Sequence, residues 1–372
     1  MLTGKILKVK QVITILRFIY TLYGFTCFLV LMLLLFPIVS FSQQKYQYKN
    51  LVLEGGGVRG LAYAGAFSEL ENKGVLQQIE KVAGTSAGAI AGLMISIGYT
   101  VKEIDSIMYS LPVEEFNDGG GGIVGKYVRA KNKYGLYEGK IFERWLRKLI
   151  KYKTGIEELT FTKLHQLHLE NNIYKDFYCT GTNLTRQQLD IFSFEHTPGM
   201  SVVLAVRISA GIPLYFEPVI LDDEYKKISV SDTISTRNYY VDGGMIANYL
   251  INIFDSCESS GNPLQCDRLH FNTQTLGIKL ERPAQIDSLK NNSSNIPPYK
   301  INSFKDYLYA FNNLLIETLN RKYPNLENEK FRTIYVSVGS VQPRVRKMKA
   351  DEKKMLYNNG VKAVTDFFDK RE

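Results

Sequence analysis

Histidine, cysteine and tryptophan are scarce in this 372-residue sequence, which contains four, four and one of them, respectively. The cysteines, which match none of the paired spacings that zinc sites and thioredoxin-like redox pairs require, are Cys27, Cys179, Cys257 and Cys266. We therefore predict no metal site and no cofactor. Cys257 and Cys266 flank a short loop containing Ser-Gly-Asn-Pro, so we expect a small disulfide loop only if this part of the chain faces an oxidising compartment.

Acidic residues are in the minority. The sequence has 46 Lys and Arg against 37 Asp and Glu, which gives a formal net charge of +9. Such a charge suits an anionic membrane surface or a nucleic acid. Because no nucleic-acid motif accompanies it, we expect no nucleic-acid partner. Hydrophobic residues at 45% and charged residues at 22% describe a globular chain rather than a disordered one.

Charged residues are absent from residues 18–42, a stretch long enough to span a bilayer. The basic residues before it are Lys5, Lys8, Lys10 and Arg17. Because Ser40 and Ser42 would serve as small residues before a cleavage point, residues 1–42 fit a membrane anchor and a signal peptide equally well. Positive charge before the stretch keeps that end in the cytoplasm, so we expect the rest of the chain, including its catalytic part, on the non-cytoplasmic side.

Beyond this stretch, short apolar runs alternate with amphipathic segments. Residues 50–57 and 79–88 are predicted to be strands that end in glycine turns, and residues 61–74 and 89–98 are predicted to be the helices that follow them. Two strand-turn-helix units in succession predict an α/β fold, with a parallel sheet covered by helices on both faces.

A glycine-rich segment and an amphipathic segment follow these two units. Residues 117–135 contain four consecutive glycines and are predicted to form an irregular surface loop. Residues 137–152 have helical periodicity, with basic residues on one face and an apolar face made of Ile141, Phe142, Trp145, Leu146, Leu149 and Ile150. A surface helix that docks this apolar face on the core is favoured over a helix at a lipid interface.

The segment "GTSAG", residues 84–88, has the Gly-x-Ser-x-Gly pattern between a predicted strand and a predicted helix. This context predicts a nucleophile elbow, in which a sharp turn lifts the hydroxyl of Ser86 clear of the sheet. Glycines on either side let neighbouring backbone approach closely. The N-terminus of the following helix then points its N–H groups at the serine, where they favour developing negative charge.

The segment "EGGGVRG", residues 54–60, contains the G-x-G-x-x-G spacing of dinucleotide-binding turns. The acidic ribose partner of such a turn is expected at the end of a second strand, whereas here the second strand leads to the serine turn. We therefore interpret the glycine run as an oxyanion hole, whose backbone N–H groups stabilise a tetrahedral oxyanion. Arg59 holds this loop, meets a phosphate, or is an ordinary solvated or salt-bridged loop arginine.

A serine nucleophile needs a base, and the four histidines supply a Ser-His-Asp triad poorly. They are His165, His168, His196 and His270. Asp242 instead ends an apolar strand in "YYVDGG". A partly buried carboxylate at that position would be a stronger base than an exposed one, although a turn aspartate in a hairpin would have the same local sequence.

In this order, "GGGVRG", "GTSAG" and "DGG" resemble the patatin-like phospholipase family. Residues 207–218, "RISAGIPLYFEP", are similar to a serine-to-proline stretch that the family carries before its aspartate. The likeness covers residues 49–282, and residues 283–372 are expected to complete one catalytic domain over residues 46–372. The resemblance implies a three-layer α/β sandwich with a parallel-rich central sheet, and a Ser-Asp dyad in place of a triad.

The resemblance also implies roles for individual residues. Ser86 would be the nucleophile and Asp242 the general base, and the oxyanion hole would be formed by Gly55, Gly56 and Gly57. The supporting motif residues are Arg59, Gly60, Gly84, Gly88, Gly243 and Gly244. One departure is visible, since Tyr249 follows Asn248 where the family commonly has proline, and this change is expected to alter the wall of the substrate site.

The implied activity is hydrolysis of fatty-acyl ester bonds in phospholipids or other lipids through an acyl-enzyme, with a lipid substrate and a membrane surface as partners and no metal in the chemistry. The predicted helix around Trp145 and the glycine-rich segment before it are expected to form the side that meets lipid. Two alternatives stay open: a catalytically silent lipid-binding scaffold with the same fold, and a Ser-His-Asp esterase that uses His270.

Overall fold

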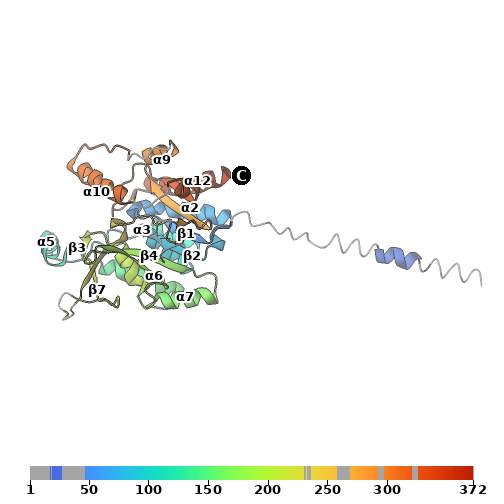
Figure 1. Cartoon of the computed structure of the whole chain (residues 1–372), viewed down its shortest axis with the longest axis horizontal. Coiled ribbons are helices and arrows are strands. Elements are labelled where there is room, and N and C mark those ends of the chain that lie inside the picture. Colours follow the sequence, from blue (N-terminus) through green and yellow to red (C-terminus); the bar gives the residue numbers. More distant parts are fainter. Residues whose placement is uncertain are drawn as a thin grey trace, which may run out of the picture. The chain divides into compact units, whose positions relative to one another are not determined.

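The computed structural model describes residues 17, 19–26, 47–229, 232, 236–257, 269–291, 297–320 and 326–371. The chain divides into two compact units, Met1–Tyr46 and Gln47–Glu372. The strands and helices named below belong to the second unit (Figure 1).

A mixed sheet forms the centre of the second unit. Its strands are β1 (Asn50–Leu53), β2 (Lys81–Gly84), β4 (Asp176–Asn183), β5 (Gln188–Phe192), β7 (Val219–Leu221), β8 (Asn238–Asp242), β11 (Thr275–Glu281) and β12 (Thr333–Ser337). Their order is β12-β11-β1-β2-β4-β8-β7, and β5 also pairs with β4. The pairs from β12 through β4 are parallel, and the pairs that involve β5 or β8 are antiparallel. All four residues of β1 are buried, as expected for a parallel strand covered on both faces.

Eleven helices belong to the described part of this unit, and helices lie on both sides of the sheet (Figure 1). They are α2 (Ala62–Asn72), α3 (Ala87–Ser96), α4 (Val101–Tyr109), α5 (Gly122–Lys133), α6 (Lys140–Thr154), α7 (Phe161–Glu170), α8 (Val202–Ser209), α9 (Pro283–Lys290), α10 (Phe304–Asn320), α11 (Leu326–Phe331) and α12 (Ala350–Asp369). Helix α3 packs on β1, β2 and β4, and α12 packs on α2. The predicted α/β sandwich with a parallel-rich central sheet is confirmed.

Short elements complete the unit. The two-stranded pairs are β3 (Gly135–Tyr137) with β6 (Leu214–Phe216), and β9 (Ser256–Cys257) with β10 (Leu269–His270). The 3-10 turns are η1 (Gly57–Leu61), η2 (Leu76–Gln78) and η3 (Gly243–Met245). Cys257 is disulfide-bonded and Cys179 is a buried free thiol, while Cys27 and Cys266 lie outside the described residues.

The predicted irregular loop at residues 117–135 is wrong, because the structure has helix α5 within it. The glycine run provides the turn into this helix, since Gly121 adopts a φ of 85° that glycine tolerates best. Buried Arg129 then fixes the run, because its guanidinium donates to the carbonyls of Gly119 and Gly120. A glycine cluster is normally a loop signal, and here it also supplies the bend that starts a helix.

The predicted location of the chain, exported across or anchored in a membrane by residues 18–42, is contradicted. Among the residues that the structure describes, no helix is both long and apolar enough to cross a bilayer. Within that range the described residues are 19–26, which are helical, and the remainder lies outside the described residues.

Strands β2 and β8 meet end to end beside β4. Both pair with β4 on the side opposite β5, and β2 is parallel to β4 whereas β8 is antiparallel. Gly84, the last residue of β2, is opposite Cys179, and Asp242, the last residue of β8, is opposite Gly181. The carboxyl ends of the two strands therefore approach one another, and the turns that follow them lie close together.

Candidate active site

Ser86 lies in the turn between β2 and α3. Its backbone has φ 53° and ψ −118°, a conformation that side-chain-bearing residues rarely adopt, as expected for a strained elbow. The Ser86 N–H donates to Oγ of Ser209 at 3.1 Å, and the hydroxyl makes no capping bond to its own helix. Ser209 was not predicted as a site residue, although it is the serine of the 207–218 stretch that the resemblance singled out.

Glycines make this turn possible. A Cβ added at Gly88 would lie 2.3 Å from the Leu53 carbonyl oxygen, and one at Gly84 would lie 2.3 Å from the carbonyl oxygen of Gly88. At Gly60 an added Cβ would lie 3.0 Å from the Cβ of Ala87. Backbone segments therefore pack here without side chains between them, which explains the spacing of the motif.

Asp242 lies at the end of β8, with its side chain 7% exposed. Its carboxylate accepts from the Gly244 N–H at 2.8 Å, and its own N–H donates to the Gly211 carbonyl at 2.9 Å. A Cβ at Gly243 would lie 2.1 Å from Oγ1 of Thr180, so this position also requires glycine. The carboxylate is thereby held in one orientation at the junction between β8 and β2.

The Ser86 side chain lies close enough to the Asp242 carboxyl to act on its pKa as a hydrogen-bond donor. Burial raises the pKa of Asp242 to about 7, against which the hydrogen bonds from Ser86 and from the Gly244 N–H act to lower it. Burial disfavours the charged carboxylate, so this group is a stronger base than an exposed aspartate would be. The structure thus brings together the two residues that the sequence singled out from separate motifs.

The glycine loop between β1 and η1 lies beside Ser86. A Cβ at Gly55 would be 3.1 Å from the Cβ of Ser86. The N–H of Gly55, however, donates to the Asn248 carbonyl at 3.1 Å and is not available to a substrate. The N–H groups of Gly56, Gly57 and Ala87 have no acceptor among the described residues. The set of free amides therefore differs from the predicted set by the loss of Gly55 and the addition of Ala87.

Glu54 and Asn248 hold the glycine loop in place, and neither was predicted as a site residue. The buried Glu54 carboxylate accepts from the Leu280 N–H at 2.6 Å and from Nδ2 of Asn248 at 3.3 Å. Nδ2 of Asn248 also donates to the Gly55 carbonyl at 3.0 Å, so Asn248 binds both polar groups of the Gly55 backbone. Glu54 directly precedes the glycines, and this proximity is the signal that could have identified it.

Two other residues lie away from the substrate region. Arg59 is buried, and its Nε donates to the Val341 carbonyl at 2.8 Å, so it holds the loop and does not present a phosphate site. Tyr249 hydrogen-bonds through its hydroxyl to Oγ1 of Thr333 at 2.7 Å, on the β12 side of the sheet. It does not line the cavity beside Ser86, so the expectation that it alters the wall of the substrate site is wrong.

An apolar cavity of about 80 Å3 adjoins Ser86. Its lining residues are almost all apolar and come from the glycine loop, α3, α4, α6 and the segments beside them: Gly57, Val58, Gly60, Leu61, Ser86, Ala87, Ile90, Met94, Ile107, Met108, Leu111, Val113, Phe116, Phe142, Trp145, Ala210, Ile212, Phe216 and Val345. Helix α6 docks its apolar face on the core as favoured by the sequence, and Trp145 is a half-buried part of the cavity wall.

None of the four histidines lines this cavity. His165 binds Asp176 through Nδ1, and His168 binds the Tyr174 carbonyl. His270 lies in β10, where it pairs with Ser256 of β9. The structure therefore gives no support to a triad built on a histidine.

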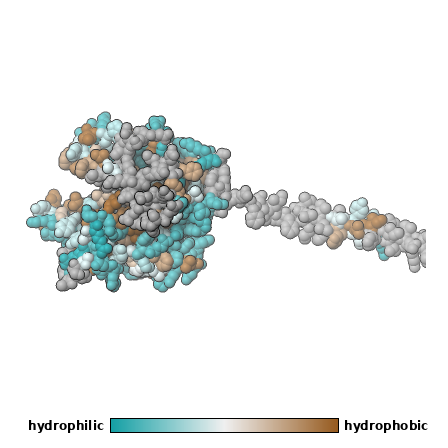
Figure 2. All heavy atoms as spheres, viewed as in Figure 1, coloured by the Kyte–Doolittle hydropathy of each residue, from teal (hydrophilic) through white to brown (hydrophobic). Residues whose placement is uncertain are grey.

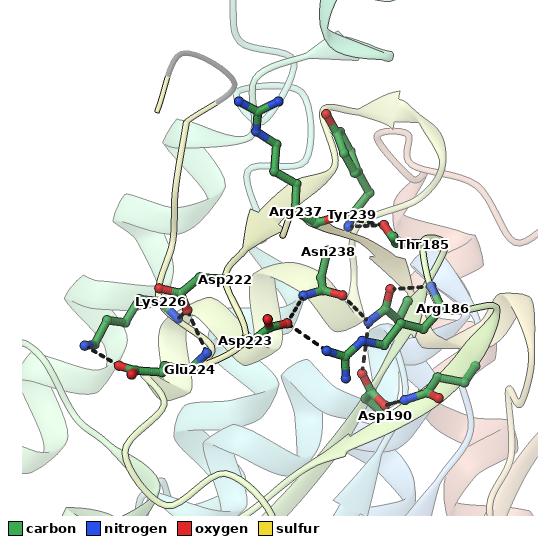
Figure 3. Close-up of polar contacts among 12 residues, drawn as sticks. Thr185, Arg186, Asp190, Asp222, Asp223, Glu224, Lys226, Arg237, Asn238 and Tyr239 are labelled. Carbon is green, nitrogen blue, oxygen red and sulfur yellow. Dashed lines mark hydrogen bonds and ion pairs between the residues drawn. The ribbon is translucent and has the colours of Figure 1, made fainter. Parts of the chain in front are cut away.

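The far end of β8 is fixed by a polar network remote from Ser86 (Figure 3). The Asp223 carboxylate accepts from Nη2 of Arg186 at 2.7 Å and from Nδ2 of Asn238 at 3.0 Å. Oγ1 of Thr185 accepts from the Tyr239 N–H at 3.0 Å. These contacts anchor the start of the strand whose other end presents Asp242.

Comparison with known proteins identifies the family of this chain. The sequence description of the patatin-like phospholipase family matches residues 51–255, more than half of the chain. The chain belongs to the patatin-like phospholipase family. The uncharacterized protein YqhO of Bacillus subtilis is 34% identical to this chain over 212 residues, which cover 56% of this chain and 67% of YqhO.

Two further proteins are similar to this chain. A probable lipid hydrolase, 463L of Invertebrate iridescent virus 6, is 28% identical over 235 residues, covering 61% of this chain and 70% of that protein. Among solved structures, VipD from Legionella pneumophila superposes with a TM-score of 0.52 at 18% identity, over 87% of this chain and 67% of VipD, and so shares the fold. As a patatin-like protein, the chain is a lipid acyl hydrolase.

Proposed function

We propose that the chain cleaves fatty-acyl esters by a Ser86–Asp242 dyad. Asp242 takes the proton from the Ser86 hydroxyl as its oxygen attacks the acyl carbonyl, and a tetrahedral intermediate forms. The proton passes to the leaving alcohol as the ester C–O bond breaks, which leaves an acyl-enzyme. Water, deprotonated by the same carboxylate, then attacks the acyl group, and fatty acid and the Ser86 hydroxyl are released.

The observation that carries this proposal is the position of Ser86 beside the buried Asp242 carboxyl, where β2 and β8 meet end to end. A base with a pKa near the working pH combines a large deprotonated fraction with useful basicity. No described histidine offers an alternative base beside the cavity, so the dyad is preferred to the His270 esterase.

The amides of Gly56, Gly57 and Ala87 are the proposed oxyanion donors. They are free of acceptors among the described residues, and Gly57 and Ala87 line the same cavity as Ser86. The N–H of Ala87 also begins helix α3, whose dipole favours negative charge at this end. Backbone donors of this kind are fixed before the reaction begins and so stabilise the oxyanion without reorganisation.

The substrate is proposed to be a phospholipid or another fatty-acyl ester. An apolar wall beside the nucleophile favours an acyl chain over a polar acyl group, and the name of the viral relative points the same way. No cation is needed in this mechanism, because backbone amides receive the negative charge.

Hydrolysis of a chromogenic short-chain ester and of phospholipid vesicles tests the dyad. Ser86→Ala and Asp242→Asn are each expected to lower kcat/KM on the soluble ester by about a thousandfold or more. Ser96→Ala on the same helix is the matched control, because its buried hydroxyl has no partner among the described residues. His270→Ala should retain the rate; loss of activity there, with Asp242→Asn still active, would transfer the role of base to His270.

Covalent labelling provides a second test. A fluorophosphonate probe should form an adduct on Ser86 in the wild-type chain and none in Ser86→Ala. A properly folded wild-type chain that neither labels nor hydrolyses either substrate would contradict the proposed mechanism.

A further inference from the structure

Helix α5 exposes apolar side chains that nothing else among the described residues covers. Ile123 is 88% exposed, Val124 73% and Tyr127 68%. Exposed apolar side chains that occur singly need no explanation, but a cluster on one short helix marks a surface that binds something. At the end of the molecule where Figure 1 labels α5, Figure 2 shows hydrophobic and hydrophilic residues side by side.

The same helix carries only positive charge. Its twelve residues include no Asp or Glu, and its basic residues are Lys126, Arg129, Lys131 and Lys133. Arg129 is buried and donates to the Gly120 carbonyl of the glycine run. Nζ of Lys133 lies 3.6 Å from Oε1 of Glu217 and forms an ion pair with it. Lys126 donates to the Tyr137 hydroxyl at 2.9 Å, and Lys131 is exposed; neither makes an ion pair among the described residues. An apolar helix with unneutralised lysines is the pattern of a helix that lies in the interface of an anionic bilayer.

This helix is joined directly to the cavity wall. It leads into β3, where Gly135 pairs with Leu214 of β6. Leu214 is 74% exposed and has a φ of 65°, and Phe216, two residues further along β6, lines the cavity. Phe116, which precedes α5 in the sequence, also lines the cavity. The segments that carry the exposed apolar residues are therefore joined directly to residues that line the cavity.

We propose that Ile123, Val124, Tyr127, Val128 and Leu214, here called the docking patch, bind the surface of an anionic phospholipid bilayer or micelle. The proposal rests on the proposed function, because it identifies the surface on which that enzyme finds its substrate. Apolar side chains enter the boundary between headgroups and acyl chains, while the lysines of α5 meet the anionic headgroups. The cavity wall is thereby brought to the lipid surface.

A second copy of this chain fits the docking patch less well. Two copies meeting through α5 would bring two basic helices together without acidic residues on either helix, and like charges oppose such contact. A neutral lipid surface would satisfy the apolar residues but leave the lysines without counter-charges. An anionic lipid surface satisfies both features.

Hydrogen exchange measured on the full-length Ser86→Ala chain tests the proposal at the helix itself, without hydrolysis. The probes are vesicles of phosphatidylcholine alone and vesicles of equal parts phosphatidylcholine and phosphatidylglycerol. Amides of residues 122–133 are expected to exchange about tenfold more slowly with the anionic vesicles than with phosphatidylcholine, and amides of residues 161–170 in α7 to be unchanged. Because the readout is local, lipid binding elsewhere in the chain does not imitate it.

Matched variants separate the docking patch from general surface properties. Ile123→Asp should abolish the protection of α5 and lower hydrolysis of anionic vesicles about tenfold, with unchanged hydrolysis of the soluble ester. Leu169→Asp on α7 removes a comparably exposed apolar side chain and should change neither rate. Lys131→Glu should weaken binding to anionic vesicles, and Lys163→Glu on α7 should not.

The outcomes that overturn the proposal are distinct from those that overturn the dyad. Unchanged exchange of α5 with anionic vesicles, in a chain whose wild-type form hydrolyses the soluble ester, would reject the docking patch and leave the dyad standing. Equal protection by both kinds of vesicle would reject the charge argument. Protection that grows with protein concentration in the absence of lipid would assign the patch to a second copy. Failure of the wild type on the soluble ester would instead count against the dyad.

Discussion

Ser86 and Asp242 each have a local feature that costs folding free energy and that serves the proposed chemistry. The positive φ of Ser86 is strained, and the Asp242 carboxyl is buried beside Ser86 and Gly244, neither of which carries a charge. Such costs persist where the rest of the fold compensates for them, and they gather at functional sites. Ser209 and Gly244 supply the compensation here, since each is hydrogen-bonded to one member of the pair.

The rate of ester hydrolysis should depend on pH through Asp242. A general base works only when deprotonated, and burial raises the pKa of Asp242 to about 7. We therefore expect kcat/KM on a soluble ester to increase about tenfold for each pH unit below about 7 and to level off above it. A rate profile measured from about pH 5 to pH 9 checks this. A rate that is already level at about pH 5, as an aspartate with its ordinary pKa of about 3.9 would give, would show that the base is not buried in the active enzyme.

Replacement of Asp242 should make the folded chain more stable above neutral pH. Its folded-state pKa of about 7 lies above the ordinary value of 3.8. The folded chain therefore holds this proton where the unfolded chain has lost it, and stability falls as pH rises between these two values. Asp242→Asn removes that penalty and should raise the free energy of unfolding at pH 8 by up to about 4 kcal/mol, with little change at pH 4.

Denaturant unfolding at both pH values measures this difference. Asp287→Asn is the control, because Asp287 is an exposed residue of α9 and its replacement should change stability by less than about 0.5 kcal/mol. Equal stability of wild type and Asp242→Asn at pH 8 would contradict the buried, high-pKa carboxyl.

At the scale of elements, local glycine patterns explain what could be predicted and long-range pairing explains what could not. The turns at Ser86 and Asp242 were predictable because each follows an apolar strand, with glycines on both sides of Ser86 and two glycines directly after Asp242. That β8 runs against β4 and meets β2 end to end depends on register between distant strands, which neither motif encodes. For the same reason the contact between Gly55 and Asn248, almost two hundred residues away, was not foreseen.

Helix α5 shows a second reason why the sequence did not predict part of the structure. Glycine is a weak helix former, so a run of four glycines predicts a loop, and only the fold reveals that buried Arg129 holds the run as the start of a helix. Close approach of neighbouring backbone around the elbow, by contrast, was expected from its glycines, and the contact of α3 with β1 tests it directly.

Gly88→Ala should damage both stability and activity. An added Cβ would lie 2.3 Å from the Leu53 carbonyl oxygen and 2.7 Å from that of Glu54, so α3 must move away from β1. We expect a loss of about 3 kcal/mol in the free energy of unfolding, at the upper end for overpacking because the obstacle is backbone. Ester hydrolysis should fall as well, since β1 carries the glycine loop.

Gly120→Ala is the control for this change, because an added Cβ there meets nothing within 4 Å. Its stability and rate on the soluble ester should remain close to wild type. A Gly88→Ala chain as stable and active as Gly120→Ala would show that α3 and β1 are not as closely packed as the structure has them.

At the scale of the whole second unit, the part of the chain after residue 255 is bound to the catalytic loop. The Val341 carbonyl accepts from Arg59, and the Arg344 carbonyl accepts from the Val58 N–H at 3.4 Å. Val345 lines the cavity. Arg332 also binds Asp255 with a pair of hydrogen bonds of 2.6 and 2.5 Å, both side chains being buried. These contacts support the prediction that residues 46–372 fold as one domain.

Trp145, the single tryptophan, makes this prediction testable, because it lies in the cavity wall and reports on unfolding there. A Cβ added at Gly360 of α12 would lie 2.2 Å from the Ala62 carbonyl oxygen of α2. Gly360→Ala should therefore lower the free energy of unfolding by about 2 kcal/mol. In one cooperative domain, Trp145 fluorescence and far-ultraviolet circular dichroism shift together to lower denaturant concentration.

Lys362→Ala, at an exposed position of α12, should shift neither transition. A Gly360→Ala chain in which circular dichroism shifts while the Trp145 transition stays in place would show that the C-terminal region unfolds separately from the catalytic part.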